Sequence, residues 1–262
     1  MAARLDGELV SADAMQVYER LPILTNQSPA RLVGIWPLSR ESSVGEYAPL
    51  AHAAIDEILA AARTPIVVGG TGLYFRAALA ELDLPPAPAP GARERWAGAY
   101  DADPAAAHAR LRELDPAAAA AVHPNDRRRV VRALELAEAG RSLAPAEDRL
   151  WSAHTRRPTL IVGLDAPQDE LERRIVERTH AMFEAGVQDE VRAALAQPIS
   201  QTARKTLGLD EVATLPRAEA IEAIVVRTRR YAAYQRKWMR RIPGLVMVES
   251  ADDVVALARA RE

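Results

Sequence analysis

Two stretches of this 262-residue chain place polar side chains directly after short apolar runs. Residues 8–18 contain Asp13 and Gln16, and residues 64–76 contain Thr71 among three glycines. A carboxylate such as that of Asp13 can accept a proton from a substrate nitrogen that comes within hydrogen-bond reach. The alternative is that Asp13 simply caps the turn that follows it, which single aspartates do more often than they catalyse.

Parallel strands would position these side chains. Residues 66–68 are all apolar, as in a sheet covered on both faces, and the glycine turn after them precedes a helix from Tyr74. A further helix is predicted over residues 44–62, after a surface loop over residues 22–43. This alternation predicts an α/β fold that binds ligands at the carboxyl ends of its strands, near Thr71. A glycine-rich turn alone is also typical of an ordinary strand-to-helix connection.

Basic side chains gather on two predicted helices. Arg128 and Arg132 lie one turn apart on the first helix, which is predicted over residues 127–139. This arrangement suits contacts with successive phosphates, but it is also typical of an ordinary solvated surface. Residues 223–248 contain seven arginines or lysines and no acidic residue. The helix predicted over residues 221–241 interleaves these cations with aromatic side chains, which suits single-stranded nucleic acid through base stacking. Such aromatics can also be core anchors, and this interpretation is preferred for Trp238.

A change of composition after Leu84 predicts a small helical insertion. Residues 85–91 are too rich in proline for a helix or a strand and predict an extended connection. The alanine-rich residues 92–122 predict two or three short helices, with Pro104 and Pro116 in first turns.

The composition excludes several classes of protein. The chain has no cysteine, which excludes disulfides, thiolate zinc sites and cysteine nucleophiles. No apolar stretch approaches the length of a membrane span and the N-terminus has no secretory pattern, so we expect a cytoplasmic protein without membrane contact. Because the formal net charge is only −2, the basic stretch indicates a polyanionic partner for one face of the molecule.

Five motifs, in order along the chain, resemble those of one family. They lie in residues 10–18 (VSADAMQVY), 67–75 (VVGGTGLYF), 123–135 (HPND, then Arg129 and RALE), 186–191 (GVQDEV) and 228–238 (TRRYA, then Gln235 and Trp238). The family is that of the tRNA dimethylallyltransferases, and the match covers nearly the whole chain. The order of the motifs makes the resemblance far more specific than any one of them.

The resemblance implies a fold and a reaction. The fold is a P-loop NTPase-like parallel sheet flanked by helices, an α/β core expected over residues 1–84 and 123–262. The helical insertion, residues 85–122, would contact the tRNA anticodon stem-loop. The reaction is transfer of a dimethylallyl group from dimethylallyl diphosphate to N6 of the adenosine 3′ to the anticodon, with Mg²⁺ as cofactor. We expect the protein to be a monomer.

The resemblance also implies roles for residues of this chain. Asp13 would be the general base that accepts the N6 proton. Thr71 would supply a hydroxyl that assists the reaction close to the reacting atoms. Lys205, or alternatively Arg204, would be the cation near the diphosphate. The tRNA-binding residues would be Asp13, Ala14, Met15, Gln16, Arg128, Arg129, Val130, Val131 and Arg132. No residue is assigned as a metal ligand. The target adenine would have to leave its base stack in the tRNA to reach a buried site.

One departure from the family concerns the phosphate-binding loop. The glycine-rich Walker A turn that ends in Gly-Lys-Ser/Thr does not occur in this sequence. We therefore expect an N-terminally incomplete sequence that lacks the first strand and this loop. Two functions are therefore considered for the protein. It is either an active prenyltransferase or a catalytically inactive, tRNA-binding remnant of the family that lacks the diphosphate-binding loop. A relative of the P-loop nucleotide kinases is disfavoured, because kinases need the same loop and the basic helix suits a larger polyanion.

Overall fold

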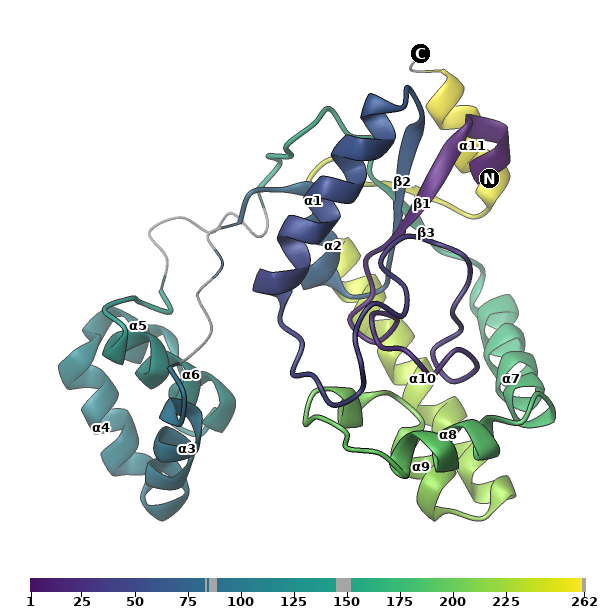
Figure 1. Cartoon of the computed structure of the whole chain (residues 1–262). Coiled ribbons are helices and arrows are strands. Elements are labelled where there is room, and N and C mark those ends of the chain that lie inside the picture. Colours follow the sequence, from purple (N-terminus) through teal and green to yellow (C-terminus); the bar gives the residue numbers. More distant parts are fainter. Residues whose placement is uncertain (83, 85–88, 145–151, 261–262) are drawn as a thin grey trace. The chain divides into compact units, whose positions relative to one another are not determined.

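The computed structural model of the protein describes residues 1–82, 84, 89–144 and 152–260 (Figure 1). The chain forms two compact units, called here the core unit (Met1–Leu82 with Leu150–Glu262) and the helical unit (Asp83–Arg149). The extended connection predicted from the prolines falls largely on residues 85–88, outside the described part of the chain. Within the described ranges, no helix combines the length and the apolar character that crossing a membrane requires.

The core unit alternates short strands with helices, and its α/β class is the one predicted. In chain order it contains a 3₁₀ turn at Ala2–Leu5, β1 (Gly7–Ser11), α1 (Val44–Ala60), β2 (Thr64–Val68), α2 (Gly72–Leu79), β3 (Val162–Leu164), α7 (Gln168–Glu184), α8 (Val187–Leu195), a 3₁₀ turn at Ala203–Lys205, α9 (Leu209–Thr214), α10 (Arg217–Met239), β4 (Val246–Val248) and α11 (Ala251–Arg259). Local signals set these limits: the Ser43 hydroxyl, for example, accepts a hydrogen bond from the Glu46 N–H and so begins α1.

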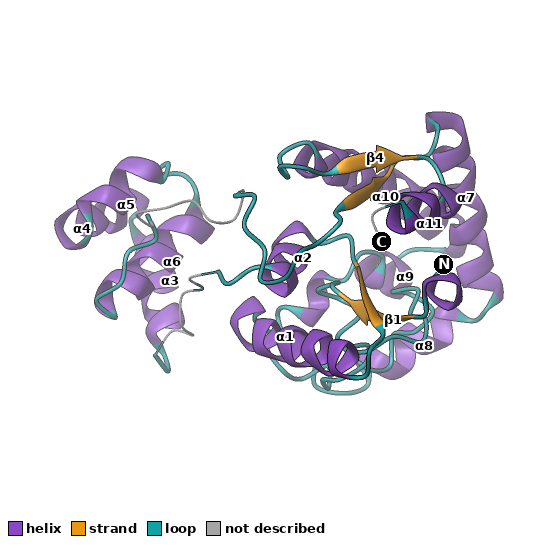
Figure 2. Ribbon diagram, turned by 90° about the horizontal axis from the view of Figure 1, so that it is seen from above, coloured by secondary structure: helices purple, strands orange, loops and turns teal. Residues whose placement is uncertain are grey.

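The strands form two separate parallel pairs (Figure 2). β1 pairs with β2 along their whole length, and β3 pairs with β4. Parallel neighbours need a crossover connection, which α1 provides between β1 and β2 while it buries Ile55 and Ile58 with Val10. The carboxyl ends of the first pair, Ser11 and Val68, therefore lie side by side.

The prediction that β2 is covered on both faces is wrong. Ile66 and Val67 are only half-buried, and Val68 is 49% exposed. Within the described ranges β2 pairs with β1 alone, so it is an edge strand of a two-stranded sheet. A run of apolar residues indicates a strand but does not show how many strands pair with it. The sequence of residues 66–68 therefore could not distinguish a central strand from an edge strand.

The segment between β1 and α1 is more than the surface loop that the sequence predicts. Leu24, Trp36 and Leu38 are buried and belong to the largest hydrophobic cluster of the core unit. An isolated β-bridge joins Tyr18 to Trp36 in place of a regular strand. This packing anchors the residues that directly follow β1, which include Asp13.

The helical unit buries one hydrophobic core among short helices. Its described helices are α3 (Ala92–Ala102), α4 (Pro104–Leu114), α5 (Pro116–Ala121) and α6 (Arg127–Glu138). As predicted, Pro104 and Pro116 occupy first turns, and the side chains of Asp103 and Asp115 cap those helices.

The helical unit extends further along the chain than expected. From the sequence, the insertion ends at residue 122 and α6 belongs to the core. In the structure, Val130 and Leu134 of α6 pack in one cluster with Tyr100 of α3 and Leu111 of α4. Alanine-rich helices carry few large apolar side chains, so the apolar stripe of α6 is needed to complete their core. The unit therefore continues through α6.

Candidate active site

Asp13 lies at the carboxyl end of β1, beside the end of β2. The Ala12 N–H donates to the Val68 carbonyl at 2.7 Å and so extends the ladder past the strand. Asp13 Oδ1 accepts hydrogen bonds from the backbone N–H groups of Met15 (2.8 Å) and Gln16 (3.3 Å). Asp13 is thus a turn cap, yet the cap uses one carboxylate oxygen. Its Oδ2 has no hydrogen-bond partner among the residues that the structure describes.

The glycine turn brings Thr71 against the Asp13 segment. A Cβ atom on Gly69 would lie 2.2 Å from the Ala12 carbonyl oxygen, so only glycine allows this approach. The Ala14 N–H donates to Thr71 Oγ1 at 3.4 Å, and Thr71 is the N-cap residue of α2. The structure therefore brings Asp13 and Thr71 together at the strand ends where the sequence places them.

Two side chains of α10 hold the other side of the glycine turn. The Tyr231 hydroxyl (3.1 Å) and Gln235 Nε2 (3.0 Å) both donate to the Gly70 carbonyl. The Tyr231 hydroxyl also lies 3.5 Å from Thr71 Oγ1. Sequence reasoning missed both as site residues, although the motif in residues 228–238 contains them and was the available signal. Trp238 of the same helix is buried in an apolar cluster, as preferred from the sequence.

Burial and charge shift the pKa values of groups around Asp13. Burial raises the pKa of Tyr231 and raises the pKa of Tyr74 to about 12, so both hydroxyls stay protonated near neutral pH. Desolvation lowers the pKa of Arg178 on α7, and the negative charge of Asp13 opposes that shift. Arg178 is therefore a cation close enough to Asp13 to feel its charge. The sequence leaves open whether this arginine faces solvent or an anion, and does not assign it to the site.

Part of the expected base-binding stretch is occupied by internal contacts. Gln16 Oε1 accepts a hydrogen bond from the Ser11 hydroxyl (2.8 Å), and Gln16 Nε2 donates to two carbonyls of the loop after β1 (3.1 Å each). Ala14 is buried. The Gln16 amide thus anchors the loop and Met15 packs against the core cluster, so Asp13 is the side chain of this stretch that remains for a substrate.

The candidate diphosphate-binding cations lie on a 3₁₀ turn next to the Asp13 segment. Thr206 follows the turn Ala203–Lys205; its hydroxyl donates to the Ala203 carbonyl at 2.7 Å, and the same oxygen lies 3.3 Å from the Met15 sulfur. Arg204 and Lys205 are both exposed, and neither forms an ion pair with a residue in the described ranges. Both cations are therefore available to an anion.

The arginine segment of α6 divides into exposed and buried residues. Arg128 and Arg129 are exposed, whereas Arg132 donates to a buried glutamate of the same helix at 2.8 Å. Val130 and Val131 lie in the core of the helical unit. Both side chains are buried, because the apolar stripe of α6 points toward α3 and α4. Contact of the segment 128–132 with tRNA stays a prediction, for which Arg128 and Arg129 are the exposed side chains.

Among the residues that the structure describes, no set of side chains forms a metal site by itself. The described residues contain no group of three or more histidine, aspartate or glutamate side chains that could hold an ion. Asp13 is a single carboxylate with one oxygen already engaged by two amides. No residue is therefore assigned as a metal ligand.

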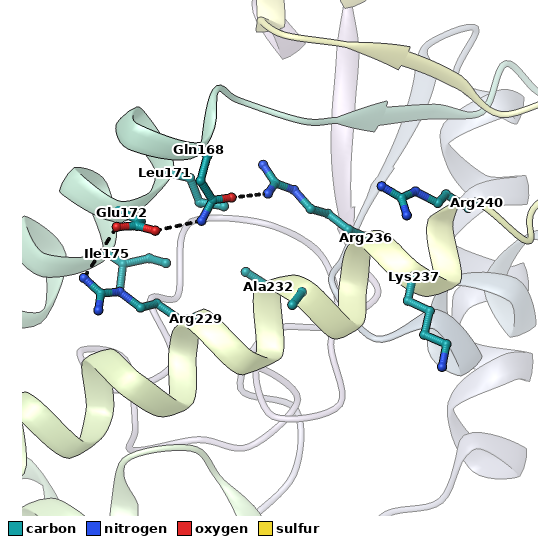
Figure 3. Close-up of a pocket in the computed structure, with 10 residues that line it drawn as sticks. Gln168, Leu171, Glu172, Ile175, Arg229, Ala232, Arg236, Lys237 and Arg240 are labelled. Carbon is teal, nitrogen blue, oxygen red and sulfur yellow. Dashed lines mark hydrogen bonds and ion pairs between the residues drawn. The ribbon is translucent and has the colours of Figure 1, made fainter.

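A separate groove of about 240 Å³ runs between α7 and α10 (Figure 3). The cations that line it are Arg229, Arg236, Lys237 and Arg240. Side chains of α7 hold the first two: Glu172 pairs with Arg229 and Gln168 with Arg236. Lys237 and Arg240 form no ion pair within the described part of the chain. Neither Asp13 nor Thr71 lines the groove, so it is distinct from the strand-end site.

Short parallel strands flanked by helices, with polar groups at the carboxyl ends of β1 and β2, make this an α/β protein, and the solved structures that it resembles give its fold as P-loop NTPase-like. Comparison with known proteins gives the family. The IPP transferase family model matches residues 16–242, and the chain therefore belongs to this family.

Relatives and solved structures agree with this assignment. A tRNA dimethylallyltransferase from Acidothermus cellulolyticus is 39% identical over 279 residues, which cover 100% of this chain and 86% of the relative. The tRNA isopentenylpyrophosphate transferase of Bacillus halodurans has a TM-score of 0.68 at 29% identity, covering 99% of this chain and 88% of that one. A eukaryotic dimethylallyltransferase acting on tRNA has a TM-score of 0.76 at 25% identity, covering 99% and 72%.

Proposed function

We propose that this chain transfers a dimethylallyl group from dimethylallyl diphosphate to N6 of the adenosine 3′ to the anticodon in tRNA. The main observation that supports the proposal is that Asp13 and Thr71 lie close together at the carboxyl ends of β1 and β2. The free cations Arg204 and Lys205 lie on the turn beside them. Family membership suggests the substrates, and the site offers a base, a hydroxyl and positive charge to receive them.

The reaction needs a proton acceptor for the adenine amine. N6 attacks C1 of the dimethylallyl group while the bond from C1 to the diphosphate oxygen breaks, and the diphosphate leaves with the bonding electrons. N6 then carries an additional proton, which Asp13 Oδ2 accepts. The amides of Met15 and Gln16 hold Oδ1, so the carboxylate is oriented before the substrate arrives.

The leaving diphosphate needs positive charge. Arg204 and Lys205 would stabilise the negative charge that develops on its bridging oxygen. Mg²⁺ would enter with the diphosphate, because diphosphate oxygens and water can supply the ligands that the chain does not. The residues of this chain bind and orient the substrates and accept the proton, and Mg²⁺ bound with the diphosphate would supply neutralising positive charge.

Positive surface on both units is suited to tRNA. Arg128 and Arg129 of the helical unit, and Lys237 and Arg240 of α10, are exposed and free to contact phosphates. The target adenine would be extruded from its stack to reach Asp13. We place the protein in the cytoplasm as a monomer that acts on its tRNA without a membrane.

A transfer assay tests the proposal. The chain is incubated with labelled dimethylallyl diphosphate, Mg²⁺ and unmodified tRNA, and label in the tRNA is the expected result. The second candidate, a catalytically inactive tRNA-binding protein, is favoured by one observation, the lack of a Walker A pattern in the sequence. Salt-sensitive binding of tRNA without transfer would support that candidate and contradict the proposal.

A further inference from the structure

The Gly70 carbonyl determines the direction of two hydrogen bonds. A carbonyl oxygen has two lone pairs and can only accept, and here Tyr231 (3.1 Å) and Gln235 (3.0 Å) fill both. Gln235 must therefore present its NH₂ group, and Tyr231 must direct its single hydroxyl proton at Gly70. Toward Thr71, the Tyr231 oxygen can then only be an acceptor.

Thr71 is consequently the donor in its contact with Tyr231. The two oxygens are 3.5 Å apart, and Thr71 Oγ1 also accepts the Ala14 N–H at 3.4 Å. Both distances are long, as contacts in active sites often are before the substrate binds and tightens them. With its proton directed at Tyr231 and one lone pair used by Ala14, the Thr71 hydroxyl has one lone pair left for a substrate.

We propose that Tyr231 is a positioning residue that holds the Thr71 hydroxyl as a hydrogen-bond acceptor toward the substrate amine. This inference rests on the proposed function. The adenine amine has two N–H bonds: Asp13 receives the proton that is released, and Thr71 accepts the N–H that stays on the product nitrogen. Two acceptors suit a primary amine better than an N6 that already carries an alkyl group.

Packing on both sides of the glycine turn supports this role. A Cβ atom on Gly70 would lie 2.1 Å from Gln235 Nε2, so the Gln235 amide would have to move to make room for any other residue at this position. On the opposite side, Gly69 lies against the Ala12 carbonyl. The buried Trp238 fixes α10 in the apolar cluster one turn further on. The glycine turn therefore packs between α10 on one side and the Asp13 segment on the other, and both contacts hold it in place.

A double-mutant cycle tests whether Tyr231 acts through Thr71. Tyr231→Phe keeps the ring and removes the hydroxyl, and should lower kcat roughly three- to tenfold, the effect of one hydrogen bond, with KM for tRNA nearly unchanged. In a Thr71→Val background the same change should have no further effect. Tyr234→Phe is the matched control, because the Tyr234 ring stacks with that of Tyr231 at 6.4 Å and its side chain is exposed; its activity should match the wild type. Equal losses of kcat in both backgrounds would overturn the proposal.

A neutron structure of the deuterated protein would locate the deuterium atoms of both hydroxyl groups. This measurement does not depend on enzymatic activity. The expected result is the Tyr231 deuterium pointing at the Gly70 carbonyl and the Thr71 deuterium pointing at the Tyr231 oxygen. A Tyr231 deuterium directed at Thr71 would refute the inference whatever the activity. If the wild type transfers no prenyl group but shows the expected deuterium positions, the proposed function fails and the assignment of the hydroxyl directions stands.

Discussion

Replacing Asp13 by asparagine separates its two roles, as a turn cap and as the proposed base. The asparagine oxygen can accept the same two amide hydrogen bonds, at 2.8 and 3.3 Å, so the segment after β1 keeps its shape. The variant loses the negative charge and the proton affinity of Oδ2. Because general-base catalysis contributes about 10²- to 10⁴-fold, kcat for prenyl transfer should fall by about that factor.

Asp13→Ala provides the comparison, because it removes the cap as well as the base. It should lose a similar factor in kcat and, in addition, about 0.5–2 kcal/mol of unfolding free energy. Asp103→Asn is a matched control, since Asp103 caps α4 through two amides at 2.9 Å but lies in the helical unit, and it should retain activity.

Single-turnover transfer rates and thermal unfolding of the three variants provide the measurement. We expect Asp13→Asn to melt like the wild type and to be nearly inactive. If Asp13→Asn keeps more than roughly a tenth of the wild-type rate, the loss is too small for a general base and the assignment is refuted.

Four further predictions concern the turn, the diphosphate, the RNA and the metal. Gly69→Ala should cost about 1–3 kcal/mol of unfolding free energy and abolish transfer, since the new Cβ would meet the Ala12 carbonyl at 2.2 Å; an unchanged melting temperature would contradict this packing. Lys205→Ala should raise KM for dimethylallyl diphosphate by roughly tenfold or more, as for a lost charged hydrogen bond, and Lys205→Arg should largely restore it; equal KM values would exclude the contact. The double variant Arg128→Ala/Arg129→Ala should weaken tRNA binding and reduce the slope of log K against log salt by about two units, and an unchanged slope would remove these arginines from the interface. EDTA should stop transfer and Mg²⁺ should restore it, whereas transfer at full rate in EDTA would exclude the metal.

Features set by local chemistry could be predicted from the sequence. The helix expected over residues 44–62 is α1, which ends two residues earlier, and the helices that begin at Pro104 and Pro116 begin there because proline fits a first turn. The places of Asp13 and Thr71 could also be predicted, since each follows an apolar run and parallel strands bring their carboxyl ends together.

Features set by distant neighbours could not be predicted. Tyr231 and Gln235 lie about 160 residues from Gly70 in the chain, and no local pattern says which face of α10 meets the glycine turn. The same limit explains the edge position of β2 and the placing of α6 in the helical unit, because both depend on which elements are adjacent in space. Arg178 becomes a site residue only through its proximity to Asp13.

The central claim is that the carboxylate at the end of β1 deprotonates an adenine amine during prenyl transfer. Its most direct test is mass spectrometry of nucleosides and oligonucleotide fragments from tRNA incubated with dimethylallyl diphosphate, Mg²⁺ and either the wild-type chain or Asp13→Asn. The expected result is one dimethylallyl group on N6 of the adenosine 3′ to the anticodon with the wild type, and none above background with the variant. A prenyl group at another position, or equal modification by both proteins, would contradict it.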